Sequence, residues 1–211
     1  MIKIEVLEDI RCFKKGVVFE FTEPTLLVGS NGSGKSTLLR ALRGYYGYKF
    51  GADQEIAHSW DTSEQDNKQL AKSFLVTTDI KEGIFFDAVL DDPARQTTDA
   101  VSLLTSGGFH LNRKSHGEAG FSLLNRCIRS RENVENRLVV LDEFDNGFSI
   151  DKQIQSNKLL TNLPKLAALV LAVSHSYLVV RFADYKLYCM DTRKFITIEQ
   201  FTNRVDFMIN Q

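Results

Sequence analysis

Residues 29–37 read Gly-Ser-Asn-Gly-Ser-Gly-Lys-Ser-Thr, and their types and spacing could bind a chain of phosphates. They fit the phosphate-binding loop pattern G-x-x-x-x-G-K-[ST]. The glycines let backbone N–H groups point inward around the phosphates, and the N-terminus of the following helix adds a positive dipole end. We expect Lys35 to reach the β- and γ-phosphates and Ser36 to ligate Mg²⁺. The other loop residues that we expect to contact the phosphates are Gly29, Ser30, Asn31, Gly32, Ser33, Gly34 and Thr37.

A pair of carboxylates follows the apolar segment Leu138–Leu141, which is typical of a strand buried on both faces. Ligands of open α/β sheets bind at the carboxyl ends of the strands. Asp142 is therefore expected to hold Mg²⁺, and Glu143 to orient and deprotonate an attacking water. The alternative interpretation is a strand that runs into an acidic surface turn.

A histidine, His175, ends the next apolar segment, residues 169–173. In that position its side chain could contact the γ-phosphate and sense whether this group is present. The alternatives are a histidine that caps the following helix and one that is exposed in a loop.

The polar segment Ser115-His116-Gly117-Glu118 precedes a predicted helix. A serine hydroxyl, a glycine N–H and a helix N-terminus together form an anion site. A single nucleotide does not require both this anion site and the phosphate loop from one chain. Two chains arranged head to tail would use both sites. We therefore expect Ser115 and Gly117 to complete the pocket of a second chain, the alternative being a surface helix cap.

The apolar periodicity predicts the elements that must position these side chains. Strands alternate with helices, which implies an α/β domain with a mainly parallel sheet and crossover helices, and the N-terminal strands add an antiparallel part. The predicted strands are residues 2–8, 17–21, 25–28, 71–78, 83–88, 138–141, 166–173, 185–190 and 195–198. The predicted helices are residues 36–45, 93–104, 118–130, 149–162 and 176–182. Residues 45–70 show no clear period and are interpreted as an irregular excursion.

Length and composition restrict the class of protein. The 211 residues, of which 43% are hydrophobic, suffice for one large domain with a full core. The net charge of −1 gives no overall electrostatic argument for nucleic acid binding. The cysteines, Cys12, Cys127 and Cys189, have neither disulfide-framework nor zinc-site spacing, which suits a reducing cytoplasm. No apolar segment approaches the length of a membrane span, so we expect no direct membrane insertion.

Taken together, these motifs resemble those of the ATP-binding-cassette (ABC) ATPase superfamily, over roughly residues 1–190. The loop at 29–36 matches its Walker A motif, Leu138–Glu143 its Walker B motif with the catalytic glutamate, and His175 its switch histidine. Ser115–Glu118 resembles the signature loop, and Asp145-Asn146-Gly147-Phe148-Ser149 resembles the D-loop.

The resemblance implies a P-loop NTPase fold with an antiparallel β subdomain and a small helical lobe at about 88–130, within a single domain over residues 1–211. It implies Mg²⁺-dependent hydrolysis of ATP, with two chains sandwiching two ATP molecules. The opening strands are similar to those of soluble chromosome-maintenance and DNA-repair ATPases, and the Ser-His-Gly-Glu signature to small stand-alone ATPases of bacteria and phages. A DNA-associated or defence-related role follows, with a protein partner such as a nuclease and DNA as a candidate ligand. An ATP-binding transporter subunit and a slow ATP-timed switch remain alternatives.

Two positions of the family pattern lack an obvious counterpart. No glutamine stands where the family has its Q-loop, and Asp87, after Ile84-Phe85-Phe86, is the substitute that we expect near the metal. Phe13 is a candidate for stacking on adenine, with the alternative that it belongs to the core. The excursion begins with Tyr45, Tyr46, Tyr48 and Lys49, an interleaving of aromatic and basic groups that is typical of surfaces that bind single strands. Acidic residues follow within the excursion and argue against nucleic acid, so we interpret it as a lobe loop.

Overall fold

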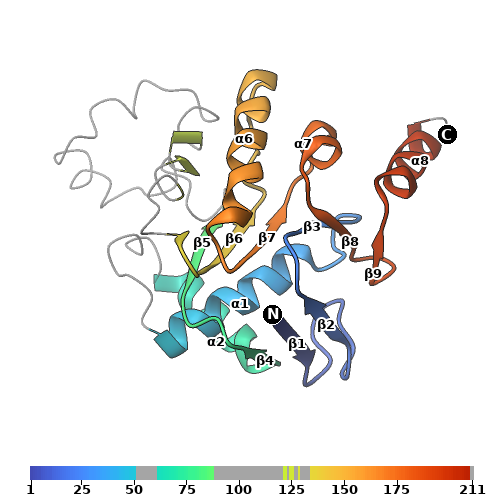
Figure 1. Ribbon diagram of the computed structural model, residues 1–211. Coiled ribbons are helices and arrows are strands. Elements are labelled where there is room, and N and C mark those ends of the chain that lie inside the picture. Colours follow the sequence, from blue (N-terminus) through green and yellow to red (C-terminus); the bar gives the residue numbers. More distant parts are fainter. Residues whose placement is uncertain (51–60, 88–120, 123, 126–127, 129–133, 210–211) are drawn as a thin grey trace.

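Two β-sheets organise the protein in the computed structural model (Figure 1), which describes residues 1–50, 61–87, 121–122, 124–125, 128 and 134–209. The smaller sheet has the order β2-β1-β4, and the larger has the order β5-β6-β7-β3-β8-β9. The strands of the smaller sheet are β1 (Ile2–Val6), β2 (Val18–Phe21) and β4 (Phe74–Thr78). Those of the larger are β3 (Thr25–Val28), β5 (Gly83–Asp87), β6 (Leu138–Asp142), β7 (Leu169–Val173), β8 (Lys186–Cys189) and β9 (Lys194–Ile196).

The larger sheet is parallel from β5 to β8, and only β9 runs antiparallel to its neighbour. The phosphate-loop strand β3 lies between β7 and β8. Because parallel strands end at the same edge, the segments after β5, β6, β7, β3 and β8 all emerge on one side of the sheet. This topology is what brings residues that are far apart in the sequence to a common site.

Apolar side chains alternate between the two faces of the larger sheet, and each face is covered. Leu138 and Val140 of β6 belong to a core shared with helix α1 (Lys35–Phe50) and the smaller sheet. Val139 and Leu141 of the same strand belong to a second core with helices α6 (Ile150–Asn162) and α7 (Tyr177–Phe182). A strand buried on both faces carries apolar residues at successive positions, which explains the apolar runs Leu138–Leu141 of β6 and Leu169–Val173 of β7.

The antiparallel sheet confirms the predicted antiparallel part of the fold. β1 pairs with β2 on one side and with β4 on the other, both antiparallel. Ile2, Ile4 and Val6 are buried, whereas Lys3 is exposed, so the alternation in the sequence places one face of this sheet on the core.

The interpretation of residues 45–70 as an irregular excursion is wrong for the residues that the structure describes. Helix α1 continues to Phe50, and helix α2 (Asp61–Lys72) packs against it. A Cβ on Gly44 would come within 2.1 Å of the Asn67 carbonyl oxygen, so only glycine permits this close approach of the two helix backbones. Gly44 and the tyrosines Tyr45 and Tyr46, which obscured the helical period, are therefore packing residues.

The C-terminal helix α8 (Ile198–Ile209) was not predicted either. A reciprocal pair of hydrogen bonds starts it: Gln200 N donates to Thr197 Oγ1 (3.1 Å), and Thr197 N donates to Gln200 Oε1 (2.9 Å). This is a capping box, and its Thr-x-x-Gln spacing was the available signal.

The helix predicted at 93–104 and most of the lobe at 88–130 lie outside the described residues. Among the helices that the structure describes, none has the length and apolarity needed to cross a membrane.

Candidate active site

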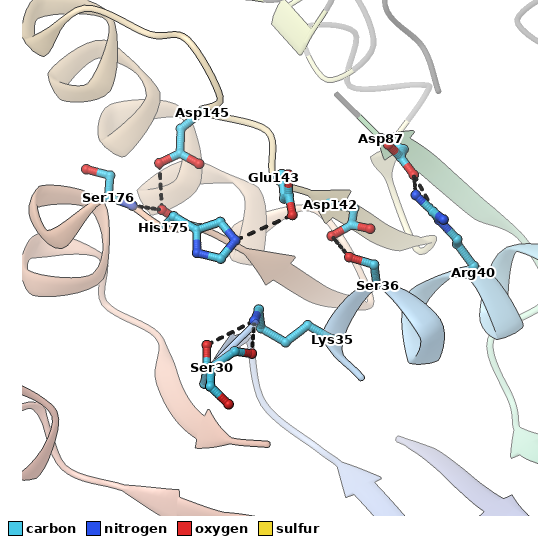
Figure 2. Close-up of polar contacts among 12 residues, drawn as sticks. Ser30, Lys35, Ser36, Arg40, Asp87, Asp142, Glu143, Asp145, His175 and Ser176 are labelled. Carbon is cyan, nitrogen blue, oxygen red and sulfur yellow. Dashed lines mark hydrogen bonds and ion pairs between the residues drawn. The ribbon is translucent and has the colours of Figure 1, made fainter. Parts of the chain in front are cut away.

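The phosphate loop connects β3 to α1, and Lys35 lies at its end with 6% of its surface exposed. The Lys35 ammonium donates hydrogen bonds to the carbonyl oxygens of Gly29 and Ser30, both at 2.9 Å (Figure 2). Burial lowers the pKa of Lys35, and the nearby carboxylates of Asp191, Glu143 and Asp142 act in the opposite direction. A phosphate that entered the loop would therefore meet a desolvated ammonium already directed at the loop interior.

Gly34 shows why the loop needs glycine. Its φ of +100° disfavours any side chain, and a Cβ there would lie 2.3 Å from the ring of Phe13. Phe13 is 2% exposed and packs edge-on against Phe19 and Phe74. It supports the phosphate loop from the core. Of the two interpretations of Phe13, a core residue and a candidate for stacking on adenine, the structure therefore supports the core residue, because the ring is not accessible.

Asp142, at the end of β6, contacts the phosphate loop directly. The Ser36 hydroxyl donates to Asp142 Oδ1 at 3.1 Å (Figure 2). Burial, reinforced by the neighbouring Asp87, raises the pKa of Asp142 to about 7. A hydroxyl beside a buried carboxylate is a donor set that suits Mg²⁺, which binds proteins through few oxygen ligands and completes its shell with water and phosphate. The residues present thus fit the metal predicted at Ser36 and Asp142.

Asp87, at the end of β5, lies in register with Asp142 on the adjacent strand. Its side chain is 5% exposed and forms an ion pair with Arg40 of α1, with Asp87 Oδ2 3.3 Å from both Nε and Nη2. Arg40 thereby offsets part of the negative charge that two adjacent buried carboxylates create. The structure brings Asp87 beside the predicted metal ligands, and its role as a substitute for the Q-loop glutamine stays a prediction.

Glu143 and His175 face each other across the ends of β6 and β7. His175 Nε2 lies 3.4 Å from Glu143 Oε1 (Figure 2). Glu143 has a φ of +48°, a left-handed conformation that is unfavourable for a residue with a side chain and is found preferentially at functional sites. Both side chains are partly exposed, 30% for Glu143 and 49% for His175, so water and a ligand can reach them.

Three residues at this edge were not found from the sequence. Asp191, just after β8, accepts hydrogen bonds from the Ser30 backbone N (3.0 Å) and hydroxyl (2.5 Å). Arg11 donates from Nη1 to Thr37 Oγ1 at 3.1 Å. Asp145 accepts from Ser174 Oγ at 2.6 Å. Asp145 opens the segment that resembles the D-loop, although its contact with Ser174 was not predicted. Arg11 stands in no recognised motif, and for Asp191 the only signal was its position just after an apolar strand.

Other predicted features lie elsewhere. Ser115 and Gly117 lie outside the described residues. Tyr46 is fully buried and its hydroxyl donates to the Ile80 carbonyl oxygen at 3.1 Å, so it cannot belong to a surface that binds single-stranded nucleic acid. Among the described residues, no three or more His, Cys, Asp or Glu side chains lie together in a group that could hold a metal ion. A metal at Ser36 and Asp142 would therefore depend on water and phosphate oxygens.

Comparisons with known proteins extend this description. The family model described as AAA domain matches residues 6–169. Among solved structures, a dimeric ATP-binding cassette in a post-hydrolysis state with ADP and Pi is similar, with 17% identity, a TM-score of 0.51, and coverage of 90% of this chain and 94% of that one. A protein described as a metal-chelate type ABC transporter in an inward-facing conformation gives 17% identity and a TM-score of 0.52 (94% and 83% covered). The ADP conformation of an ATP-binding cassette of an ABC transporter gives 17% and 0.50 (96% and 93%). No curated protein matches the chain.

The predicted fold class is thereby confirmed. The mixed sheet with its parallel strands, the flanking helices and the antiparallel sheet form the α/β P-loop NTPase fold of ABC-type ATPases. At 17% identity, the solved structures support the fold alone. The assignment of roles to individual residues depends on the geometry of this chain.

Proposed function

Because the chain belongs to the AAA domain family, we propose that it hydrolyses ATP to ADP and phosphate with the help of Mg²⁺. ATPases of the ABC and AAA type bind ATP, generally with Mg²⁺. One observation carries the proposal: Lys35, Ser36, Asp142, Glu143 and His175 converge at the carboxyl ends of the adjacent strands β3, β7 and β6. A purely structural acidic turn would not need a lysine, a hydroxyl and a histidine beside it.

Each side chain has a distinct role in the proposed reaction. The loop N–H groups and Lys35 bind the phosphates and offset their charge. Ser36 and Asp142 hold Mg²⁺, which neutralises charge on the β- and γ-phosphates when bound. Glu143 accepts the proton of the water that attacks the γ-phosphorus, while the bond from that phosphorus to the β–γ bridging oxygen breaks. His175, within contact of Glu143, stabilises the charge on the transferred group.

The replacement Glu143→Gln tests this mechanism. It keeps the size of the side chain and removes the proton acceptor, so we expect phosphate release to fall by at least about 100-fold with ATP affinity retained. Asp151→Asn, an exposed carboxylate on α6, is the matched control and should hydrolyse ATP normally. Wild-type turnover in Glu143→Gln would overturn the assignment of the base.

We further propose that two chains sandwich two ATP molecules, with Lys35 and Ser36 of one chain and Ser115 and Gly117 of the other around each γ-phosphate. The motif resemblance supports this arrangement, and the similar cassette bound to ADP and Pi is dimeric. In light scattering, Glu143→Gln should form a dimer when ATP is added. Hydrolysis would then remove the phosphate that links the two halves, and dimer opening would be the work step.

Mixing two inactive variants tests the sandwich directly. Lys35→Ala disables the phosphate loop, and Ser115→Arg disables the signature. A mixed dimer holds one site in which both halves are intact, so activity should return when the two inactive proteins are combined. A mixture that stays inactive, or a Glu143→Gln protein that stays monomeric with saturating ATP, would exclude the sandwich for this chain.

The process that hydrolysis serves is a separate proposal. We favour a DNA-associated or phage- or defence-related role with a protein partner such as a nuclease, because the opening strands and the Ser-His-Gly-Glu signature resemble soluble ATPases of that kind. The second candidate, an ATP-binding transporter subunit, is suggested by the similar cassettes of ABC transporters, and the third is a slow ATP-timed switch. Stimulation of the ATPase rate by DNA would support the first, and co-purification with a membrane permease the second. Slow hydrolysis that neither DNA nor a permease changes would support the third.

A further inference from the structure

His175 lies between two serines with different partners: the Ser174 hydroxyl contacts the turn that follows Glu143, and the Ser176 hydroxyl contacts helix α6, which comes after that turn. Ser174 directly follows β7, and Ser176 is the N-cap of α7. The serines are linked to each other as well, because Ser176 N donates to Ser174 Oγ at 3.0 Å. The backbone on both sides of His175 is therefore fixed by side-chain hydrogen bonds.

The first contact is made by Asp145, which lies two residues after Glu143. Its Oδ2 accepts from Ser174 Oγ at 2.6 Å, a hydrogen bond that Figure 2 draws as a dashed line from Asp145. Asp145 is 7% exposed and Ser174 5%, so water competes little for this hydrogen bond. A buried carboxylate is costly unless it is satisfied by donors, and here the donors belong to the segment that carries His175.

The second contact is made by Gln153 of α6. The Ser176 hydroxyl donates to Gln153 Oε1 at 2.8 Å and accepts from Val179 N at 3.3 Å, so it caps α7 and binds α6 at the same time. The amide of Gln153 in turn donates to the Phe148 carbonyl oxygen at 3.2 Å. Gln153 thus connects the turn that follows Glu143 to the start of α7.

We propose that Asp145 and Gln153 are positioning residues that hold His175 against Glu143 by binding the serines on either side of it. This inference rests on the proposed ATPase function, in which His175 acts on the transferred phosphate. The side chain of His175 is half exposed, so we expect its direction to depend on how its backbone is held. A displacement of His175 by about 1 Å can cost up to about 100-fold in rate.

The same contacts link His175 to residues 145–149, the segment that resembles the D-loop. A shift of that segment would move Ser174 and Ser176 and, with them, His175. In the proposed dimer, the position of this turn would therefore set the position of the histidine.

A double-mutant cycle tests the proposal. Gln153→Ala and Ser174→Ala should each lower kcat about tenfold and leave ATP affinity unchanged within about twofold. When each change is combined with His175→Ala, it should lower kcat by less than about a further twofold, because its effect on kcat is transmitted through the histidine. An equal loss with and without His175 would overturn the proposal, as would a His175→Ala protein with wild-type kcat.

Two controls separate positioning from general destabilisation. Gln155→Ala changes a glutamine on the same helix whose Oε1 accepts from Lys152, and it should keep wild-type kcat. Ser174→Thr keeps the hydroxyl and should recover most of the activity lost in Ser174→Ala. If Ser174→Ala does not fold, Gln153→Ala alone decides, because its side chain lies at the partly exposed surface of α6.

The position of His175 can also be measured without ATP hydrolysis, so that the positioning and the proposed function are tested separately. In side-chain NMR spectra of histidine, Gln153→Ala should shift the His175 ring signals, which are identified by their loss in His175→Ala, and Gln155→Ala should not. A wild-type protein that does not hydrolyse ATP would refute the proposed function. Unchanged His175 signals in Gln153→Ala would refute the positioning.

Discussion

The phosphate loop and the strand-end cluster (Asp142, Glu143, Asp145, Ser174 and His175) face the same site but are built differently. The loop lies within nine consecutive residues, and Lys35 bonds to carbonyl oxygens of that same segment. The cluster combines residues from the ends of β6 and β7, and its contacts join positions about thirty residues apart in the chain. The loop is thus largely a local structure, whereas the cluster exists only in the folded sheet.

Because of this difference, we expect substitutions in the two regions to impair different steps, nucleotide binding in one case and turnover in the other. Damage to the loop should abolish nucleotide binding, because in the proposed mechanism the backbone donors and the lysine act on the phosphates directly. Damage to the cluster should reduce turnover while binding persists.

The largest effect is expected for Lys35→Ala. Removing the ammonium eliminates the main cation of the loop, and hydrolysis should fall by about 1,000-fold together with ATP binding. Glu143→Gln, in contrast, should lose hydrolysis and keep binding, as isothermal titration of ATP would show. Equal ATP affinities in the two variants would contradict the separation.

The next effect concerns the stability of the metal-free protein as a function of pH. Asp142 has a pKa of about 7 in the folded protein and an ordinary value of 3.8, so the folded state binds the proton more tightly. The free energy of unfolding should therefore fall as pH rises from about 4 to about 7, by roughly 4 kcal/mol at most, and level off above that. In Asp142→Asn this contribution should be absent.

Urea denaturation in the presence of a chelator, at a series of pH values, measures this difference. A wild-type pH dependence retained in Asp142→Asn would contradict it. Added Mg²⁺ should reduce the slope in the wild type, because the metal and the proton compete for the same carboxylate.

A pair of glycine variants tests how local the loop is. Gly34→Ala introduces a Cβ at a φ of +100° and 2.3 Å from the Phe13 ring, so it should cost about 3 kcal/mol of stability and abolish ATP binding. Gly32→Ala meets no atom within 4 Å, and its φ of +80° alone should cost about 1 kcal/mol.

Thermal unfolding and ATP titration compare the two glycine variants. Equal stabilities would mean that Phe13 does not constrain the loop. The expected difference would show that the loop, although local in sequence, also depends on Phe13, which lies in the segment between β1 and β2.

The smallest effect is expected for Asp191→Asn. Asp191 accepts from the backbone and hydroxyl of Ser30, but both residues are exposed, and hydrogen bonds at exposed sites contribute little. ATP affinity should change by no more than about threefold. A loss comparable to that of Lys35→Ala would show that the start of the loop is held from β8.

The sequence predicted the elements that carry a regular pattern. The apolar runs of β3, β6 and β7 and the alternation in β1 were identified, because burial on two faces or on one face leaves a direct trace in the sequence. The end of α1 at residues 46–50 and the helix α2 were missed, since the packing of the two helices depends on Gly44 and Asn67, which lower rather than raise helical propensity. The helix α8 was missed although Thr197 and Gln200 marked its start.

By itself, the sequence determined the phosphate loop, the acidic end of β6 and the α/β fold class. Each of these depends on residue types at fixed short spacing or on the period of buried strands. The tertiary structure decided which residues meet: Asp142 with Ser36, Glu143 with His175, and Asp145 with Ser174. It also placed Phe13 under the loop instead of beside a base. These contacts follow from the order of strands in the sheet, and that order is not encoded in any local pattern.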